Sequence, residues 1–136
     1  MSTQVSAITA AEHYRIDISS GGHSFVADEP PALGGANAGP SPFALVLAGL
    51  AACTGITLRM YAERKQWQGL RVSIQLDLVL RENRHLIRRQ VAVVGAPDEA
   101  GLARLRDIVE RTPVTLALKA GFDIDTELAS GTLARA

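Results

Sequence analysis

A long apolar segment that follows a helix-start signal is the feature that most restricts the fold of this chain. Ser41 and Pro42 form the signal, because serine caps free backbone amides and proline fits the first helical position. From Phe43 to about Lys65 the sequence predicts one helix, and its first two-thirds is apolar on every side. A helix of this kind has to be enclosed, so we expect it at the centre of the fold.

The same segment is too short to be a membrane span. Its apolar part runs from Phe43 to Leu58 and is interrupted by Thr54, Gly55 and Thr57, whereas a span needs about 20 predominantly apolar residues. The first residues show no basic stretch followed by an apolar run, so we expect no signal peptide. The sequence therefore predicts a buried core helix and no membrane partner.

Short strands are predicted before this helix. Residues 14–19 alternate between apolar and polar side chains, which is typical of a half-buried strand. Gly21-Gly22 then predicts a hairpin turn, and His23 to Ala27 the returning strand. Asp28 to Pro40 is rich in proline and glycine and is predicted to be a loop.

A strand pair is predicted after the helix. Residues 70–81 alternate strictly, Glu82-Asn83-Arg84 predicts a turn, and Leu86 to Val94 predicts the antiparallel partner. Pro97-Asp98 opens an amphipathic helix whose apolar face consists of Leu102, Leu105, Ile108 and Val109.

The last elements begin with a second cap-plus-proline signal. Thr112-Pro113 predicts a short helix that ends near Gly121. Phe122 to Leu128 alternates again and predicts a final half-buried strand, and residues from about 131 to 136 are expected to fray.

These elements predict a single α+β domain over residues 1–136, with an antiparallel sheet packed around the central helix. One layer of strands and one amphipathic helix would not cover a helix that is apolar all round. A second copy of the chain would complete the cover, so we expect a homodimer.

Charge and cysteine content bear on the expected partners and on the cell compartment. The 14 basic residues balance the 14 acidic ones, which gives no electrostatic reason to expect nucleic acid as a partner. The chain has one cysteine and cannot form an internal disulfide, which favours a reducing cytoplasm where a free thiol stays usable.

That cysteine, Cys53, is the candidate catalytic residue. One interpretation is a small buried hydrophobe, which is how free cysteines usually behave. The other is a thiolate nucleophile, which needs a cationic or hydrogen-bonding neighbour from elsewhere in the fold. Arg15 and Arg59 are the candidates for that neighbour.

Other motifs favour structural interpretations. His13, His23 and His85 lack ligand spacing, so no metal site and no cofactor are expected. The glycine-rich run 34–39 lacks the lysine of a phosphate loop, and no nucleophile elbow occurs. The basic residues Arg81, Arg84, Arg88 and Arg89 are expected at a hairpin tip, as a solvated face or a subunit contact.

Several runs of residues resemble the OsmC/Ohr superfamily, and specifically its OsmC-like "redox protein" branch. The resemblance covers nearly the whole chain. It is carried by Asp28-Glu29-Pro30, Gly34-Gly35, Gly39-Pro40-Ser41-Pro42-Phe43, Ala51-Ala52-Cys53-Thr54, the run from Thr57 to Lys65, and Arg111-Thr112-Pro113-Val114.

The resemblance implies an intertwined homodimer with the cysteine helices buried centrally and the active site at the subunit interface. It also implies a thiol-dependent peroxidase in which Cys53 attacks a peroxide and becomes a sulfenic acid. In such proteins a second cysteine resolves the sulfenic acid, and an arginine and a glutamate hold the thiolate ready.

The chain departs from that pattern at the supporting residues. Thr112 stands where the resolving cysteine would precede Pro113, and Phe43 stands at the place of the glutamate. The loop from Asp28 to Pro40 contains no arginine, which leaves Arg15 as the candidate substitute.

Three interpretations therefore stay open. The first is a one-cysteine peroxide reductase that acts on a small organic hydroperoxide and uses an external thiol as the resolving reductant. The second is a non-catalytic relative that binds a small apolar ligand at the dimer interface, since Phe43 makes that pocket more apolar. A structural dimer with an inert cysteine is a third.

Overall fold

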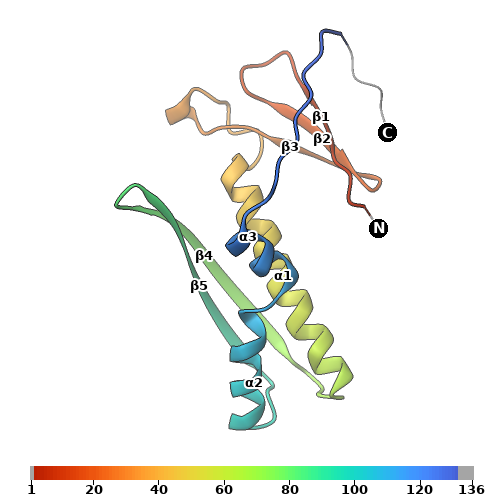
Figure 1. Ribbon diagram of the computed structural model, residues 1–136, viewed down its shortest axis with the longest axis vertical. Helices are drawn as coiled ribbons and strands as arrows, with labels where there is room; N and C mark the ends of the chain where they lie inside the picture. Colours follow the sequence, from red (N-terminus) through yellow and green to blue (C-terminus); the bar gives the residue numbers. More distant parts are fainter. Residues whose placement is uncertain (1, 132–136) are drawn as a thin grey trace. The chain divides into compact units, whose positions relative to one another are not determined.

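The computed structural model describes residues 2–131. It has two antiparallel sheets and one long helix, which confirms the predicted α+β class (Figure 1). The chain divides into two compact units. The first comprises residues up to 45 and from 125 onward, and the second comprises residues 46–124.

The first unit contains a three-stranded sheet in the order β1-β2-β3. Its strands are β1 (Ser6–Thr9), β2 (Ile16–Ser20) and β3 (His23–Ala27). The hairpin between β2 and β3 turns at Gly21 and Gly22, with φ angles of 56° and 83°. Because both residues need positive φ, two glycines fit this turn without strain, as the sequence predicts.

Asp28 organises the loop that follows β3. Its carboxylate accepts backbone N–H bonds from Glu29 at 2.7 Å, Ala36 at 3.2 Å and Ala38 at 3.0 Å. The side chain is buried, and a 3₁₀ turn, η1 (Pro31–Leu33), lies within the loop. One carboxylate thus accepts the hydrogen bonds of loop amides that have no strand partner.

Two glycines allow this loop to close tightly. A Cβ atom at Gly35 would overlap the carbonyl oxygen of Glu29, and one at Gly39 would overlap that of Val26. These glycines are needed for close backbone approach.

Helix α1 (Pro42–Arg64) confirms the predicted helix and its start. The Ser41 Oγ atom accepts the N–H of Ala44 at 3.3 Å. By length and composition alone the whole of α1, with 23 residues, could cross a membrane, although its apolar part from Phe43 to Leu58 is shorter. Within this chain, burial reaches only one stripe of the helix, namely Leu50, Thr54, Leu58 and Ala62. The expected enclosure on every side is therefore not provided by a single chain, because sheet and helices of the second unit pack on one face only.

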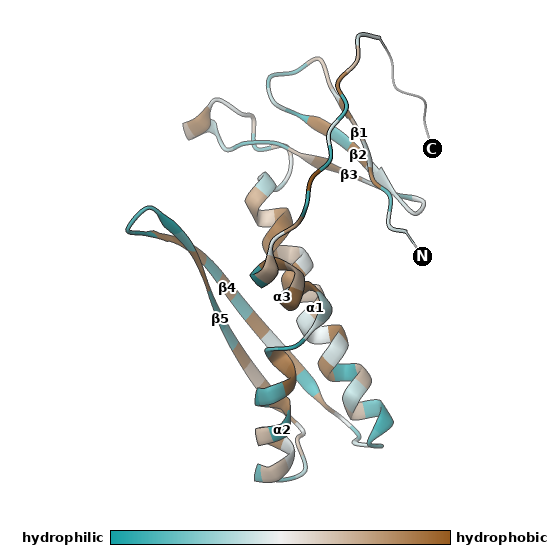
Figure 2. Ribbon diagram, viewed as in Figure 1, coloured by the Kyte–Doolittle hydropathy of each residue, from teal (hydrophilic) through white to brown (hydrophobic). Residues whose placement is uncertain are grey.

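The second unit contains a long hairpin of β4 (Arg71–Arg81) and β5 (Arg84–Val94). Glu82 and Asn83 form its turn, with φ angles of 51° and 64°. Alternate residues of both strands are half-buried on one face, and Figure 2 shows the alternating hydropathy along the hairpin. The predicted strand pair and its turn are confirmed.

Two capped helices follow the hairpin. Asp98 caps α2 (Glu99–Val109) by accepting the Gly101 N–H at 2.7 Å. Thr112 caps α3 (Pro113–Ala120), where proline occupies the first turn. Both starts confirm the predicted signals.

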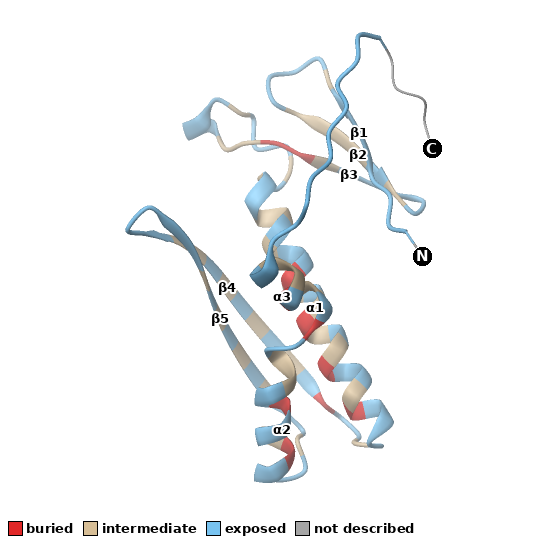
Figure 3. Ribbon diagram, viewed as in Figure 1, coloured by how far each residue is buried: buried red, intermediate tan, exposed pale blue. Residues whose placement is uncertain are grey.

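The core of the second unit joins α1, α2 and the start of β4. Leu58, Ala62, Leu70 and Leu105 form its buried centre, and Figure 3 shows buried positions on α1, on α2 and near the start of β4. Tyr61 and Trp67 pack against this cluster, with their rings edge to face at 5.4 Å between centroids.

The strand predicted over Phe122 to Leu128 is wrong. These residues have no strand assignment, and Phe122, Ile124 and Leu128 are strongly exposed. Alternation favours a strand only where another strand pairs with it, and within residues 2–131 no strand does so here. Residues 132–136 of the expected frayed end lie outside the described residues.

The Asp28 loop predicts an acid-sensitive stability. Hydrogen bonds from the Ala38 and Glu29 amides, and then Ala36, hold the pKa of Asp28 below its ordinary value, although burial opposes this. A lowered folded-state pKa stabilises the protein above the unfolded value, about 3.9, and this contribution is lost as the pH falls through the folded value. We expect Asp28→Asn to lower the urea midpoint at pH 7.

The same comparison at low pH provides the control. The difference in midpoint between wild type and Asp28→Asn should shrink as the pH is lowered from about 5 towards 2. A difference that stays constant over this range would contradict a role for the ionised carboxylate.

Candidate functional site around Cys53

Cys53 lies in the middle of α1 and is half-buried. Its Sγ atom accepts the backbone N–H of Val114 at 3.5 Å and lies 3.9 Å from the Thr57 hydroxyl. Val114 is in the first turn of α3, and the N-terminus of a helix carries partial positive charge. The sulfur therefore faces a donor and a helix end that both favour negative charge on it.

The cap of α3 leaves this amide available. The first N–H groups of a helix have no partner within the helix. The Thr112 hydroxyl, which is fully buried, takes the N–H of Thr115 at 3.4 Å and lies 2.6 Å from the Thr115 hydroxyl. The N–H of Val114 remains, and it points to Cys53.

Arg89 is not at the hairpin tip, and that part of the prediction is wrong. It lies well inside β5, opposite Leu76 of β4, and its side chain is only 12% exposed. It has the same strand parity as Ile87, Val91 and Val93, which are half-buried on the inward face. This parity is the sequence signal that could have identified Arg89 as an inward residue.

The guanidinium of Arg89 joins three helices. Nη1 donates to the hydroxyls of Thr54 in α1, at 3.0 Å, and Thr115 in α3, at 2.9 Å. Nη2 donates to the carbonyl of Val109, the last residue of α2, at 2.8 Å. Thr54 in turn donates to the Leu50 carbonyl at 2.7 Å. The ion is thus held mainly by neutral oxygens.

Glu110 supplies a more distant countercharge. Its carboxylate lies 3.9 Å from Nη2 of Arg89 and accepts a bond from Lys119 at 2.8 Å. The hydrogen bond from Lys119, together with the charges of Lys119 and Arg89, lowers the pKa of Glu110 against the effect of burial. Glu110 is more than half exposed, so solvent weakens this ion pair.

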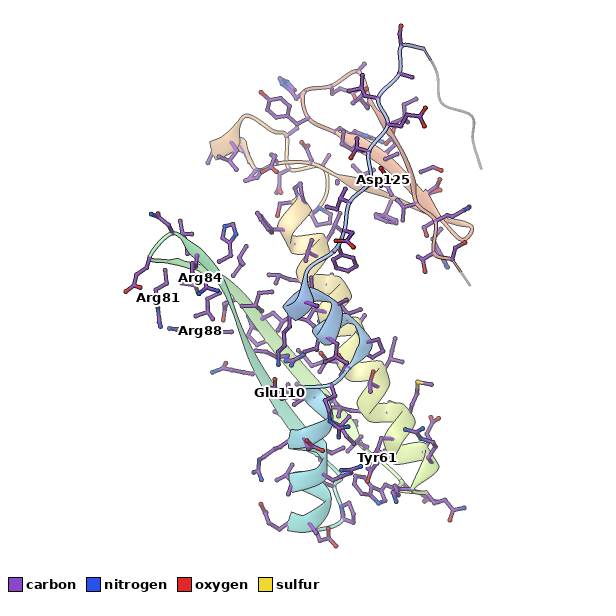
Figure 4. All side chains as sticks on the ribbon, viewed as in Figure 1. Tyr61, Arg81, Arg84, Arg88, Glu110 and Asp125 are labelled. Carbon is purple, nitrogen blue, oxygen red and sulfur yellow. The ribbon has the colours of Figure 1, made fainter. Side chains whose placement is uncertain are left out.

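The other arginines named from the sequence have different partners. Arg59 makes an exposed pair with Glu63, one turn along α1, and Arg15 donates to Asp17 within the first unit. Figure 4 labels Arg81 and Arg84 near the hairpin turn and Arg88 farther along β5. All three are exposed in the single chain, which fits both predicted alternatives, a solvated face and a subunit contact. In the structure, Arg89 rather than Arg59 donates to Thr54, the residue next to Cys53.

A groove of about 390 Å³ lies beside the Arg89 network. Its wall is apolar at Leu50, Leu86, Ile87 and Leu118, and polar at His85, Arg89, Glu110, Thr115 and Lys119. Phe43, the other residue singled out from the sequence, belongs to the first turn of α1 and is half exposed.

The chemistry that this arrangement allows is that of a single nucleophile. A sulfur beside an N–H donor can react as a thiolate, whereas residues 2–131 contain no cluster of His, Cys, Asp and Glu able to hold a metal.

The Arg89 network predicts the effect of removing one of its acceptors. Thr115→Val keeps the branched shape but leaves a charged donor without its oxygen. We expect the free energy of unfolding to fall by about 1–3 kcal/mol, measured by urea denaturation. Thr115→Ser, which keeps the hydroxyl, is the matched control and should recover most of the loss. Equal stability of the Val variant and wild type would contradict this account.

Comparison with known proteins identifies a family model and several structures. A model described as OsmC-like protein matches residues 34–127. No curated protein sequence matches the chain.

Among solved structures, an OsmC like protein from Mycoplasma pneumoniae is 19% identical with a TM-score of 0.67, covering 88% of each chain. An organic hydroperoxide resistance protein OsmC from Legionella pneumophila is 18% identical, with a TM-score of 0.57 over 88% of this chain and 90% of that one. The organic hydroperoxide resistance protein OhrB of Bacillus subtilis is 23% identical, with a TM-score of 0.56 over 88% and 91%.

Proposed function

Because the chain belongs to the OsmC-like protein family, we propose that it is a thiol-dependent peroxide reductase with Cys53 as its nucleophile. Its structural relatives include proteins named for organic hydroperoxide resistance. We infer that α1 is a core helix rather than a membrane span. The observation that carries the proposal is the Val114 N–H, at the positive end of α3, 3.5 Å from the Cys53 sulfur.

The proposed chemistry balances as follows. The Cys53 thiolate attacks one peroxide oxygen, the O–O bond breaks, and the alkoxide leaves with a proton from solvent as an alcohol. The cysteine becomes a sulfenic acid. An external thiol then displaces water and forms a mixed disulfide, and a second equivalent releases the thiolate and an external disulfide.

An external reductant is proposed because the chain has one cysteine. Thr112, at the position of the resolving cysteine in the resemblance, caps α3 instead. A small organic hydroperoxide is the proposed substrate, since two structural relatives are named for organic hydroperoxide resistance. We place the protein in the cytoplasm, where free thiols stay reduced.

Stopped-flow oxidation tests the proposal. Reduced protein is mixed with cumene hydroperoxide, and separately with hydrogen peroxide, and loss of the Cys53 thiol is followed. We expect cumene hydroperoxide to oxidise Cys53 at least about tenfold faster than it oxidises a free small thiol. This ratio corresponds to about 1.4 kcal/mol of transition-state stabilisation. Catalytic turnover with an added dithiol should be absent from Cys53→Ala.

A rate equal to that of the small thiol would reject peroxide reduction. Turnover that survives in Cys53→Ala would reject Cys53 as the nucleophile.

A second candidate function is the binding of a small, mainly apolar ligand without catalysis. It is favoured by the groove of about 390 Å³, a volume within the range of small-molecule sites. The two functions separate at Cys53→Ala, which should keep ligand affinity in a binding protein and lose all activity in a peroxidase.

We also propose that the protein acts as a homodimer. The face of α1 away from its buried stripe carries exposed apolar side chains at Val46, Ile56 and Met60. Gly49 and Ala52 lie between them and are also exposed, so the stripe continues along the helix. A second copy would cover it.

Sedimentation analysis tests the dimer. Wild type should have twice the mass of one chain, and Ile56→Glu should sediment as a monomer because it would bury a charge in the interface. Ser73→Glu, on the exposed face of β4, is the control and should leave the dimer intact. A monomeric wild type would contradict the proposal.

A further inference from the structure

The hydroxyls held by Arg89 belong to the two residues next to the Cys53–Val114 contact. Thr54 follows Cys53 in α1, and Thr115 follows Val114 in α3. A single nitrogen, Nη1 of Arg89, donates to both hydroxyls, at 3.0 and 2.9 Å. The guanidinium therefore links α1 to α3 one residue away from the contact that polarises the sulfur.

We propose that Arg89 is a positioning residue for the thiol. It holds the first turn of α3 against α1, so that the Val114 N–H stays within reach of Cys53 Sγ. Arg89 acts through Thr54 and Thr115, not on the substrate. The value of this positioning for catalysis rests on the proposed function, whereas its effect on the thiol does not.

The other hydrogen bonds of the two threonines show that both hydroxyls accept from Arg89. The Thr54 hydroxyl gives its proton to the Leu50 carbonyl at 2.7 Å, so it can only accept from Arg89. The Thr115 hydroxyl lies 3.5 Å from the Val109 carbonyl and can donate there. Each threonine is thereby oriented as an acceptor towards the same guanidinium.

Arginine suits this position better than lysine. Its planar fork reaches Thr54 and Thr115 from one nitrogen while Nη2 holds the Val109 carbonyl at 2.8 Å. The Val109 bond also fixes the end of α2, from which the chain turns into α3. A lysine ammonium is a single point donor and would not span the same three oxygens.

Alkylation of Cys53 by iodoacetamide between pH 6 and 9 tests the inference, because this readout requires no peroxide. In Arg89→Met we expect the rate at neutral pH to fall by about three- to tenfold, the size of a helix-terminus effect, and the pH profile to move upward. Arg89→Lys should recover part of the rate. Arg88→Met removes the neighbouring, outward arginine and should behave as wild type.

A merely structural role for Arg89 predicts the opposite sign. Loosening of the unit would expose the half-buried thiol and speed alkylation. Val91→Ala, which truncates an inward side chain of the same strand, supplies this comparison. An Arg89→Met rate equal to or above that of wild type would overturn the inference.

Non-additivity provides a second criterion. If Arg89 acts through Thr115, the double variant Arg89→Met/Thr115→Val should react at nearly the rate of Arg89→Met alone. If the two substitutions instead reduce the alkylation rate by the product of their single effects, Arg89 does not act through Thr115. Failure of the proposed function is seen separately, as slow oxidation of the wild type by cumene hydroperoxide while the alkylation differences remain.

Discussion

The larger unit of this protein has to supply hydrogen-bond acceptors to a guanidinium ion on the inward face of its β-hairpin. Removing such an ion from water costs several kcal/mol unless its donors are satisfied. Arg89 lies among apolar residues of β5 and obtains its oxygens from Thr54, Thr115 and the end of α2. The arrangement of three helices on one sheet face is thereby tied to a single side chain, in addition to the apolar core around Leu58 and Leu105.

Much of the fold could be predicted from the sequence because its signals are local. The caps at Ser41, Asp98 and Thr112 each act on amides within the next turn, so the residues that start the helix are neighbours in the chain. The β4–β5 hairpin is equally local, since its register follows from the turn at Glu82 and Asn83.

The failures concern partners that are distant in the chain. Residues Phe122 to Leu128 have the alternating pattern of a half-buried strand, but a strand also needs a neighbouring strand to pair with. The charge of Arg89 makes it resemble the three exposed arginines of the hairpin, but its strand parity matches Val91 and Val93. Cys53 could be named from the sequence, whereas its contact with Val114, 61 positions later, could not be inferred from spacing.

The cap of α3 has a consequence for the cycle of a one-thiol protein. A cysteine at position 112 would have to leave its capping place to join a disulfide, and the first turn of α3 would open with it. Thr112 has no thiol and cannot join a disulfide, so its bond from the Thr115 N–H need not break when Cys53 is oxidised. In the proposed one-thiol cycle, an external reductant would therefore meet a helix α3 that is still capped.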